Sequence, residues 1–281
     1  MTIRLSTKNH DRDAAGMTYV YPVISRRAGG VSVGINLNPN NACNWHCAYC
    51  QVPDLVRGVA PEIDVMVLRD ELSNMLTDIL EGNFMRERVP EDCRKLCDVA
   101  MSGNGEPTSC VQFDVVVQAI VEVMQVFQLT VPLRLISNGS YVHKAPVRQG
   151  LALMAKHHGE VWMKVDTVTD EGLQRINGIK LNQQRLRQQI EVAADLCPTW
   201  IQTCMFQWDA QPPTEKEISA YISFLSALKS AAVPIQGVLL YGLARPSLQD
   251  ESVHLSPLDN TWMQMIAKRI EQTGFAIKLS L

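Results

Sequence analysis

The chain has 281 residues, of which 46% are hydrophobic, and it carries a formal net charge of −3 with a pI near 6.1. This length and hydrophobic content suffice for one large core, and α/β barrels of this size commonly form a single domain. Without excess positive charge the chain lacks the electrostatic field of a general nucleic-acid binder, although nucleic acid as a substrate stays open.

The N-terminal segment carries charges without an apolar stretch behind them, so we expect neither a signal peptide nor a membrane anchor. No apolar run approaches the length of a membrane span. The chain has eight cysteines, far below the density of a small disulfide scaffold. We therefore expect a cytoplasmic protein with reduced thiols and no membrane partner.

Hydrophobic patterning predicts alternating strands and helices beyond residue 30. β-Rich segments predict strands over 31–37, 96–101, 132–136, 161–165, 200–206, 235–240 and 276–279. Apolar spacing predicts helices over 68–80, 111–127, 146–157, 169–196 with an interruption near Gly178, from about 213 onward, and over 258–273. Such alternation predicts a parallel sheet with right-handed crossovers. We expect an α/β fold, a partial (β/α)6 TIM-like barrel of parallel strands with outer helices.

One domain is expected over residues 1–281, because no low-complexity linker divides the chain. It would comprise an N-terminal extension over 1–30, a barrel core over 31–242, and a C-terminal helix with a closing strand over 243–281. Polar residues follow the strands at the ends where an α/β barrel carries its active site. These are the cysteine loop after the first strand, then Glu106, Asn138, Asp166, Gln207 and Arg245.

Three cysteines, Cys43, Cys47 and Cys50, lie close together in the run N-A-C-N-W-H-C-A-Y-C. Three thiolates from one loop leave the fourth corner of a metal cluster without a protein ligand, and a further molecule can bind there. This spacing favours an iron–sulfur cluster; zinc, with His46 as a further ligand, and disulfides are alternatives. The other five cysteines form no second tight group, and we interpret them as structural: Cys93, Cys97, Cys110, Cys197 and Cys204.

These motifs resemble those of radical S-adenosylmethionine (SAM) enzymes. The three cysteines match the family signature C-x-x-x-C-x-x-C, and Tyr49 matches the aromatic residue before its last cysteine. The resemblance implies that the three thiolates hold a [4Fe–4S] cluster, that its fourth iron binds S-adenosylmethionine, and that Tyr49 lies near the adenine.

A second segment, Gly103-Asn104-Gly105-Glu106, is similar to the family's Gly-Gly-Glu motif, with Asn104 where many members have glycine. The resemblance implies that the glycines let the backbone approach the methionine end of S-adenosylmethionine and that Glu106 accepts from its ammonium group. As an alternative, the segment is only a strand-ending turn.

Three later strand ends add weaker candidates for contacts to the cofactor. Asn138 and Asp166 resemble the family's ribose- and carboxylate-binding positions, and Gln207 is a further candidate. The alternatives are local, because Asn-Gly is a common turn and Asp166 could cap the helix that follows.

Arg245 and Lys164 are the candidate catalytic residues. The guanidinium of Arg245 could clamp a carboxylate or phosphate of the substrate or cofactor, and an ion pair with Asp250 or Glu251 is the alternative. Lys164, two residues before Asp166, should face the same side of its strand and point into the barrel.

The runs S-N-G-S, V-W-M-K-V-D, I-Q-T-C-M-F and L-Y-G-L-A-R-P-S resemble a subgroup of iron–sulfur oxidoreductases similar to the wyosine tRNA-base synthases. The family implies an electron donor such as flavodoxin or ferredoxin, reductive cleavage of S-adenosylmethionine to a 5′-deoxyadenosyl radical, and hydrogen abstraction from a small-molecule, peptide or nucleotide substrate. Alternatives are an activating enzyme that installs a radical on a partner protein, a tRNA-base-modifying enzyme, and a non-enzymatic iron–sulfur carrier.

Overall fold

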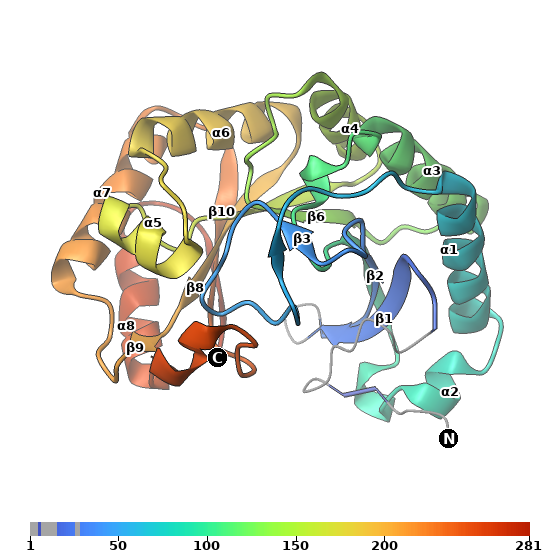
Figure 1. Ribbon diagram of the computed structural model, residues 1–281, viewed down its shortest axis with the longest axis horizontal. Coiled ribbons are helices and arrows are strands. Elements are labelled where there is room, and N and C mark those ends of the chain that lie inside the picture. The colour runs from blue at the N-terminus through green and yellow to red at the C-terminus, as the bar shows by residue number, and fades with distance from the viewer. Residues whose placement is uncertain (1–4, 7–15, 26–28) are drawn as a thin grey trace.

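The computed structural model describes residues 5–6, 16–25 and 29–281, and its sheet curls into a half-barrel with helices on the outer side (Figure 1). The sheet has the order β1-β2-β5-β6-β7-β8-β10-β12, and every neighbouring pair is parallel except β1 and β2. Its strands are β1 (Val20–Ser25), β2 (Gly30–Ile35), β5 (Leu96–Met101), β6 (Leu133–Ser137), β7 (Glu160–Lys164), β8 (Thr199–Met205), β10 (Ile235–Gly242) and β12 (Ile277–Ser280). The expected partial α/β barrel is confirmed, with each predicted strand placed to within two residues.

Helices lie between the strands of the sheet, and several of them begin at a capping side chain. They are α1 (Val65–Leu80), α2 (Phe84–Arg88), α3 (Phe113–Val126), α4 (Ala145–Lys156), α5 (Asp170–Asn177), α6 (Gln183–Leu196), α7 (Glu215–Ser230) and α8 (Asn260–Glu271). Asp64, Thr169 and Asn182 accept from backbone N–H groups at the starts of α1, α5 and α6. The interruption predicted near Gly178 is the end of α5, where this glycine adopts φ 63°.

Short elements complete the chain outside the main sheet. They are the strands β3 (Ala42–Cys43), β4 (Val56–Arg57), β9 (Gln207–Trp208) and β11 (Leu255–Ser256), and the 3-10 turns η1 (Glu91–Cys93), η2 (Pro107–Ser109) and η3 (Asp250–His254). No helix within the described ranges is long and apolar enough to cross a membrane.

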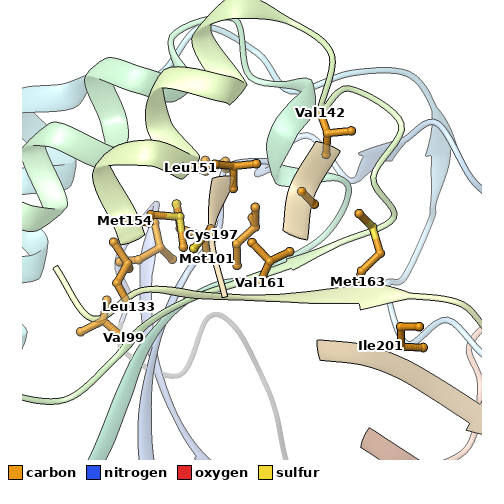
Figure 2. Packing of buried hydrophobic residues seen from close by; sticks show 14 of the residues in the cluster. Val99, Met101, Leu133, Val142, Leu151, Met154, Val161, Met163, Cys197 and Ile201 are labelled. Atoms are coloured by element: carbon orange, nitrogen blue, oxygen red, sulfur yellow. The ribbon is translucent and has the colours of Figure 1, made fainter. Parts of the chain in front are cut away.

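The core lies between the outer face of the sheet and the helices. Alternate residues of the central strands point to this face and are fully buried, including Val99, Leu133 and Val161. Leu151 and Met154 of α4 belong to the same buried cluster (Figure 2). Because strand side chains alternate between faces, the intervening residues point to the inner side of the half-barrel.

No strand is predicted before residue 31, and that prediction is wrong. β1 pairs antiparallel with β2, and Pro22 lies opposite Val33 within this pair. A proline argues against a strand from sequence because it lacks an N–H donor, but an edge strand tolerates it. Part of the extension expected over residues 1–30 thus belongs to the sheet, whereas residues 1–4, 7–15 and 26–28 lie outside the described residues.

Candidate active site

A cavity of about 310 Å³ lies on the inner side of the half-barrel. Its walls follow the two-residue period of the strands, with contributions from Asp98 and Ala100 (β5), Arg134 and Ile136 (β6), Trp162 and Lys164 (β7), and Gln202 and Cys204 (β8). The cysteine loop, residues 43–50, and the segment after β10 close one side of it. Most of the predicted site residues therefore share one cavity.

All three loop cysteines line this cavity and are half-buried. The end of α5 binds the loop, since His46 N donates to Asn177 O at 3.1 Å and Ala48 N donates to Ile176 O at 2.8 Å. Arg57 joins the same contact by donating to the Gly178 carbonyl at 2.6 Å.

The segment after β10 binds the loop from another direction. Ser247 Oγ donates to Ala48 O at 2.7 Å, and the Leu248 backbone donates to Cys50 O at 2.9 Å. The Gln249 amide donates to Val52 O at 2.8 Å. Residues 247–249 thus bind the backbone of the cysteine loop across almost 200 positions in the sequence. These contacts within the protein hold the loop in its conformation.

The glycine-rich segment after β5 also contacts the loop. Asn104 Nδ2 donates to Asn41 Oδ1 at 2.6 Å, and a Cβ at position 105 would collide with the Ala42 carbonyl. Gly105 is therefore required for packing against the start of the cysteine loop. Gly103, Asn104 and Gly105 also line the cavity, where the resemblance placed the methionine end of the cofactor.

Glu106 is 2% exposed and lies on the cavity wall, but its carboxylate already has four protein donors. Oε1 accepts from Thr108 N at 3.1 Å, from the Thr108 hydroxyl, and from Ser137 Oγ at 2.6 Å, and Oε2 accepts from Asn138 N at 2.7 Å. Burial raises the pKa of this carboxyl, and the donors oppose the rise. Glu106 thereby ties the end of β5 to the end of β6.

Asn138 connects the end of β6 to the cysteine loop. Its side-chain nitrogen donates to Asn44 Oδ1 at 2.9 Å, and its side-chain oxygen accepts from Ser140 N at 3.0 Å. It lines the cavity and is 2% exposed.

A hydrogen-bonded chain runs from Lys164 to a loop cysteine. Lys164 donates to the Tyr49 hydroxyl, which donates to Asp166 Oδ2 at 2.6 Å. Asn177 donates to the same Asp166 oxygen at 2.8 Å and to Cys47 Sγ at 3.5 Å. The other Asp166 oxygen accepts from the backbone N–H of Cys204 at 3.0 Å, so protein groups engage both oxygens of this carboxylate.

Burial and the Asp166 carboxylate together determine the pKa shifts of Lys164 and Tyr49. Burial alone would lower the pKa of Lys164, but the Asp166 carboxylate 3.7 Å away raises it well above its usual value. Burial and the same carboxylate raise the pKa of the Tyr49 hydroxyl well above its usual range. Lys164 is therefore an ammonium group and Tyr49 a neutral donor at neutral pH.

The three thiols of the cysteine loop are suitable ligands for an iron–sulfur cluster. Burial raises the pKa of Cys43 to about 11 and that of Cys47 to about 12, so in the protein alone both thiols are protonated at neutral pH. A bound metal group would have to displace these protons. Among the described residues no three His, Cys, Asp or Glu side chains converge tightly enough to hold one metal ion. A [4Fe–4S] cluster does not require such convergence, because each thiolate binds a different iron.

Of the remaining predicted site residues, Arg245 lines the cavity, whereas Asp166 and Gln207 do not. Arg245 lines the cavity and donates to Gln51 Oε1 at 2.9 Å, while Glu251, one of its expected ion-pair partners, lies 3.3 Å from His46. Gln207 does not line the cavity. It lies on β9, and its side-chain oxygen accepts from Ser256 of β11 at 2.8 Å.

Several residues of the cavity and loop were not predicted from the sequence. Asp98, Arg134, Trp162, Gln202 and Cys204 line the inner wall, and Asn177 contacts Cys47. The wall residues of β7 carry a signal, because Trp162 and Lys164 alternate with the apolar Val161 and Met163. Asn177 carries no such signal, since only the docking of α5 brings it to the loop.

No protein-family model matches the chain. The GTPase Obg of Brachyspira hyodysenteriae is 26% identical over 132 residues, which are 47% of this chain and 17% of that protein. The match spans about a sixth of the GTPase, and we draw no activity from it.

Solved structures place the fold in a class. The chain has the half-barrel fold of radical SAM enzymes. Similar structures are TYW1 with a lysine–pyruvate adduct bound (TM-score 0.57, 15% identity, 95% of this chain and 79% of that one) and a radical SAM methyltransferase from Sphaerobacter thermophilus (0.57, 10%, 89% and 66%). SuiB of Streptococcus suis, bound to S-adenosylmethionine, is similar with a TM-score of 0.54 and 12% identity over 90% of this chain. The chain spans about half of SuiB, 47% of its length. At these low identities the TM-scores establish a likeness of the fold alone.

Proposed function

We propose that this protein is a radical SAM enzyme whose cysteine loop holds a [4Fe–4S] cluster. The observation that carries the proposal is the loop itself, since three thiols of one backbone segment line a cavity at the strand ends of a radical SAM fold. When bound and reduced by an external donor such as a flavodoxin or ferredoxin, the cluster and S-adenosylmethionine would supply a 5′-deoxyadenosyl radical that takes a hydrogen atom from the substrate.

The chain's own residues position these groups. Tyr49, Asn138 and the segment 103–105 line the cavity beside the loop, and we assign them contacts to the cofactor. Glu106 and Asp166 act as positioning residues, because their oxygens are already engaged by protein donors. Lys164 holds the Tyr49 hydroxyl, and Arg245 offers a guanidinium for an anionic group near the loop.

The proposal is tested by anaerobic reconstitution with iron and sulfide, reduction with dithionite, and measurement of 5′-deoxyadenosine formed from S-adenosylmethionine. We expect about four irons per chain and formation of the product. Cys43→Ala should lose both, because two thiolates cannot retain the cluster.

Cys93→Ala is the matched control, since it also removes one thiol but lies in η1, outside the loop. It should retain iron and product formation at the level of the unmodified protein. A fully iron-loaded, reduced protein that forms no 5′-deoxyadenosine would refute the proposal, and so would full activity in Cys43→Ala.

A further inference from the structure

Gln202 of β8 has an unusual environment in the cavity wall. It is 2% exposed, and its side-chain oxygen is buried without a hydrogen-bond partner among the described residues. Three other side-chain oxygens share this condition, on Asn38, Asn177 and Gln189, but none of those residues lines the cavity. A buried amide oxygen without a partner costs about 1–3 kcal/mol. The oxygen atom itself is covered, so a ligand in the cavity would satisfy it once the Gln202 side chain turns toward the cavity.

Register places Gln202 beside the proposed reaction site. Gln202 is the ladder partner of Lys164, and residues paired across parallel strands lie about 4.8 Å apart with side chains on the same face. The Lys164 ammonium contacts the hydroxyl of Tyr49 in the cysteine loop. Cys204, two residues further along β8, lines the cavity next to this contact. The Gln202 amide therefore lies one layer of side chains deeper in the barrel than the loop.

Charged groups in the cavity wall already have partners within the protein. Arg134 pairs with Asp98 and with Glu160, the latter at 2.5 Å. The remaining pairings are Lys164 with Tyr49 and Asp166, and Glu106 with its four donors. Arg245 donates to the neutral Gln51 and lies at the cysteine loop. A charged ligand group beside Gln202 would lose its hydration without gaining an unpaired counter-ion. A neutral group with hydrogen-bonding capacity loses less and satisfies the amide.

We infer that Gln202 forms a subsite for a neutral amide or lactam group of the substrate, one that presents an N–H donor and a C=O acceptor on the same edge. The glutamine amide has the complementary donor and acceptor and can bind such an edge through two parallel hydrogen bonds. Because this subsite serves the substrate of the proposed radical reaction, the inference rests on the proposed function. It specifies the chemistry that the inner cavity recognises.

The test uses the cluster-loaded protein with S-adenosylmethionine and the probe 2-pyridone, a lactam, with binding followed by ligand-observed NMR. We expect 2-pyridone to bind at least tenfold more tightly than N-methyl-2-pyridone, which lacks the donor, and than benzoate, which is anionic. Gln202→Leu should weaken 2-pyridone binding about tenfold, the loss expected for its hydrogen bonds to the amide.

Gln189→Leu is the matched control, because it removes another buried glutamine with an unpaired oxygen that lies on α6, away from the cavity. It should bind 2-pyridone as the unmodified protein does. Equal affinity of Gln202→Leu and the unmodified protein would overturn the inference. If Gln202→Leu does not fold, the unmodified protein still tests the inference. Binding of N-methyl-2-pyridone or of benzoate as tightly as 2-pyridone would overturn it.

Formation of 5′-deoxyadenosine is measured on the same unmodified sample. If lactam binding depends on Gln202 but no 5′-deoxyadenosine forms, the proposed function is contradicted and the inferred subsite still stands. Product formation without lactam selectivity would contradict the subsite alone.

Discussion

Asn177 links a proposed cluster ligand to the residues that orient the loop. It is fully buried at the end of α5, and its side-chain nitrogen donates both to Cys47 Sγ and to Asp166 Oδ2. Hydrogen bonds to ligand sulfur set the reduction potential of iron–sulfur clusters. A donor stabilises the additional negative charge of the reduced state, so Asn177 should raise the potential.

Asn177→Leu should therefore make the reduction potential of the reconstituted cluster more negative. Loss of one hydrogen bond of about 1 kcal/mol corresponds to roughly 40 mV for a one-electron couple. A redox titration followed by electron paramagnetic resonance measures this shift.

Asn182→Ala is the control for a general loss of stability. Asn182 caps α6 by accepting from Arg185 N at 2.8 Å, and loss of such a cap costs about 1 kcal/mol. The cluster potential should be unchanged in this variant. An unchanged potential in Asn177→Leu would contradict the assigned role, as would an equal shift in both variants.

At the scale of elements, the end of α5 fixes the cysteine loop through a glycine. Gly178 has φ 63°, and a Cβ there would lie 2.8 Å from the His46 carbonyl oxygen and 3.1 Å from an Arg57 guanidinium nitrogen. Gly178→Ala should destabilise the fold by about 1–2 kcal/mol through backbone strain alone. It should also push α5 away from the loop, which would show as faster loss of iron to a chelator.

Gly16→Ala separates backbone strain from the collision with the loop. Gly16 has φ 65°, similar to Gly178, but a Cβ there meets no atom within 4 Å. This variant should show a comparable loss of stability in urea denaturation and a normal rate of iron loss. If Gly178→Ala also retains iron normally, α5 does not hold the loop in place.

The order of strands and helices could be predicted because hydrophobic period is a local property of the sequence. The break at Gly178 and the strand ends that carry Glu106, Asn138 and Asp166 follow from the same signal. The sequence does not predict β1, because a strand tolerates a proline such as Pro22 only at the edge of a sheet. The edge position of β1 is known only from the folded structure.

The candidate site was predictable where residues are adjacent in sequence and not where the fold brings distant segments together. The spacing of Cys43, Cys47 and Cys50 identifies the loop directly, but the segment over 247–249 contacts it across almost 200 residues. The hydrogen-bond partners of the site side chains could not be predicted from the sequence either. The sequence predicts a cofactor contact for Asp166, which stays a prediction, but it gives no sign that the oxygens of this carboxylate accept from Tyr49, Asn177 and Cys204.

At the scale of the whole molecule, the interior of the half-barrel contains a cluster of paired charged side chains. Arg134 on β6 bonds Asp98 of β5 and Glu160 of β7, and its guanidinium lies 4.7 Å from the centre of the Trp162 ring. The Asp98 side chain is 3% exposed. These contacts link three neighbouring strands on the inner face of the sheet.

Arg134→Leu should destabilise the protein by about 3 kcal/mol at neutral pH, because it leaves the buried Asp98 carboxylate without its counter-ion. Chemical denaturation measures the loss. Arg269→Leu removes a half-buried arginine paired with the exposed Glu215 at 2.6 Å and should cost less than about 1 kcal/mol. Equal losses in the two variants would contradict a structural role for the inner group.

The loss in Arg134→Leu should depend on pH with a sign that Asp98 determines. Burial already raises the pKa of Asp98 in the folded protein, and Arg134 opposes that rise, so its removal should raise the pKa further. A carboxyl with a raised folded pKa contributes stability that is fully present below its unfolded pKa, about 3.9, and is lost as pH rises through the folded value. The deficit of Arg134→Leu relative to the unmodified protein should therefore shrink as pH falls from 7 toward about 4. Adding Asp98→Asn, which mimics the protonated acid, should recover part of the loss at pH 7 and abolish most of its pH dependence. A deficit that is constant across this range would show that the lost packing on Trp162, and not the uncompensated carboxylate, causes the instability.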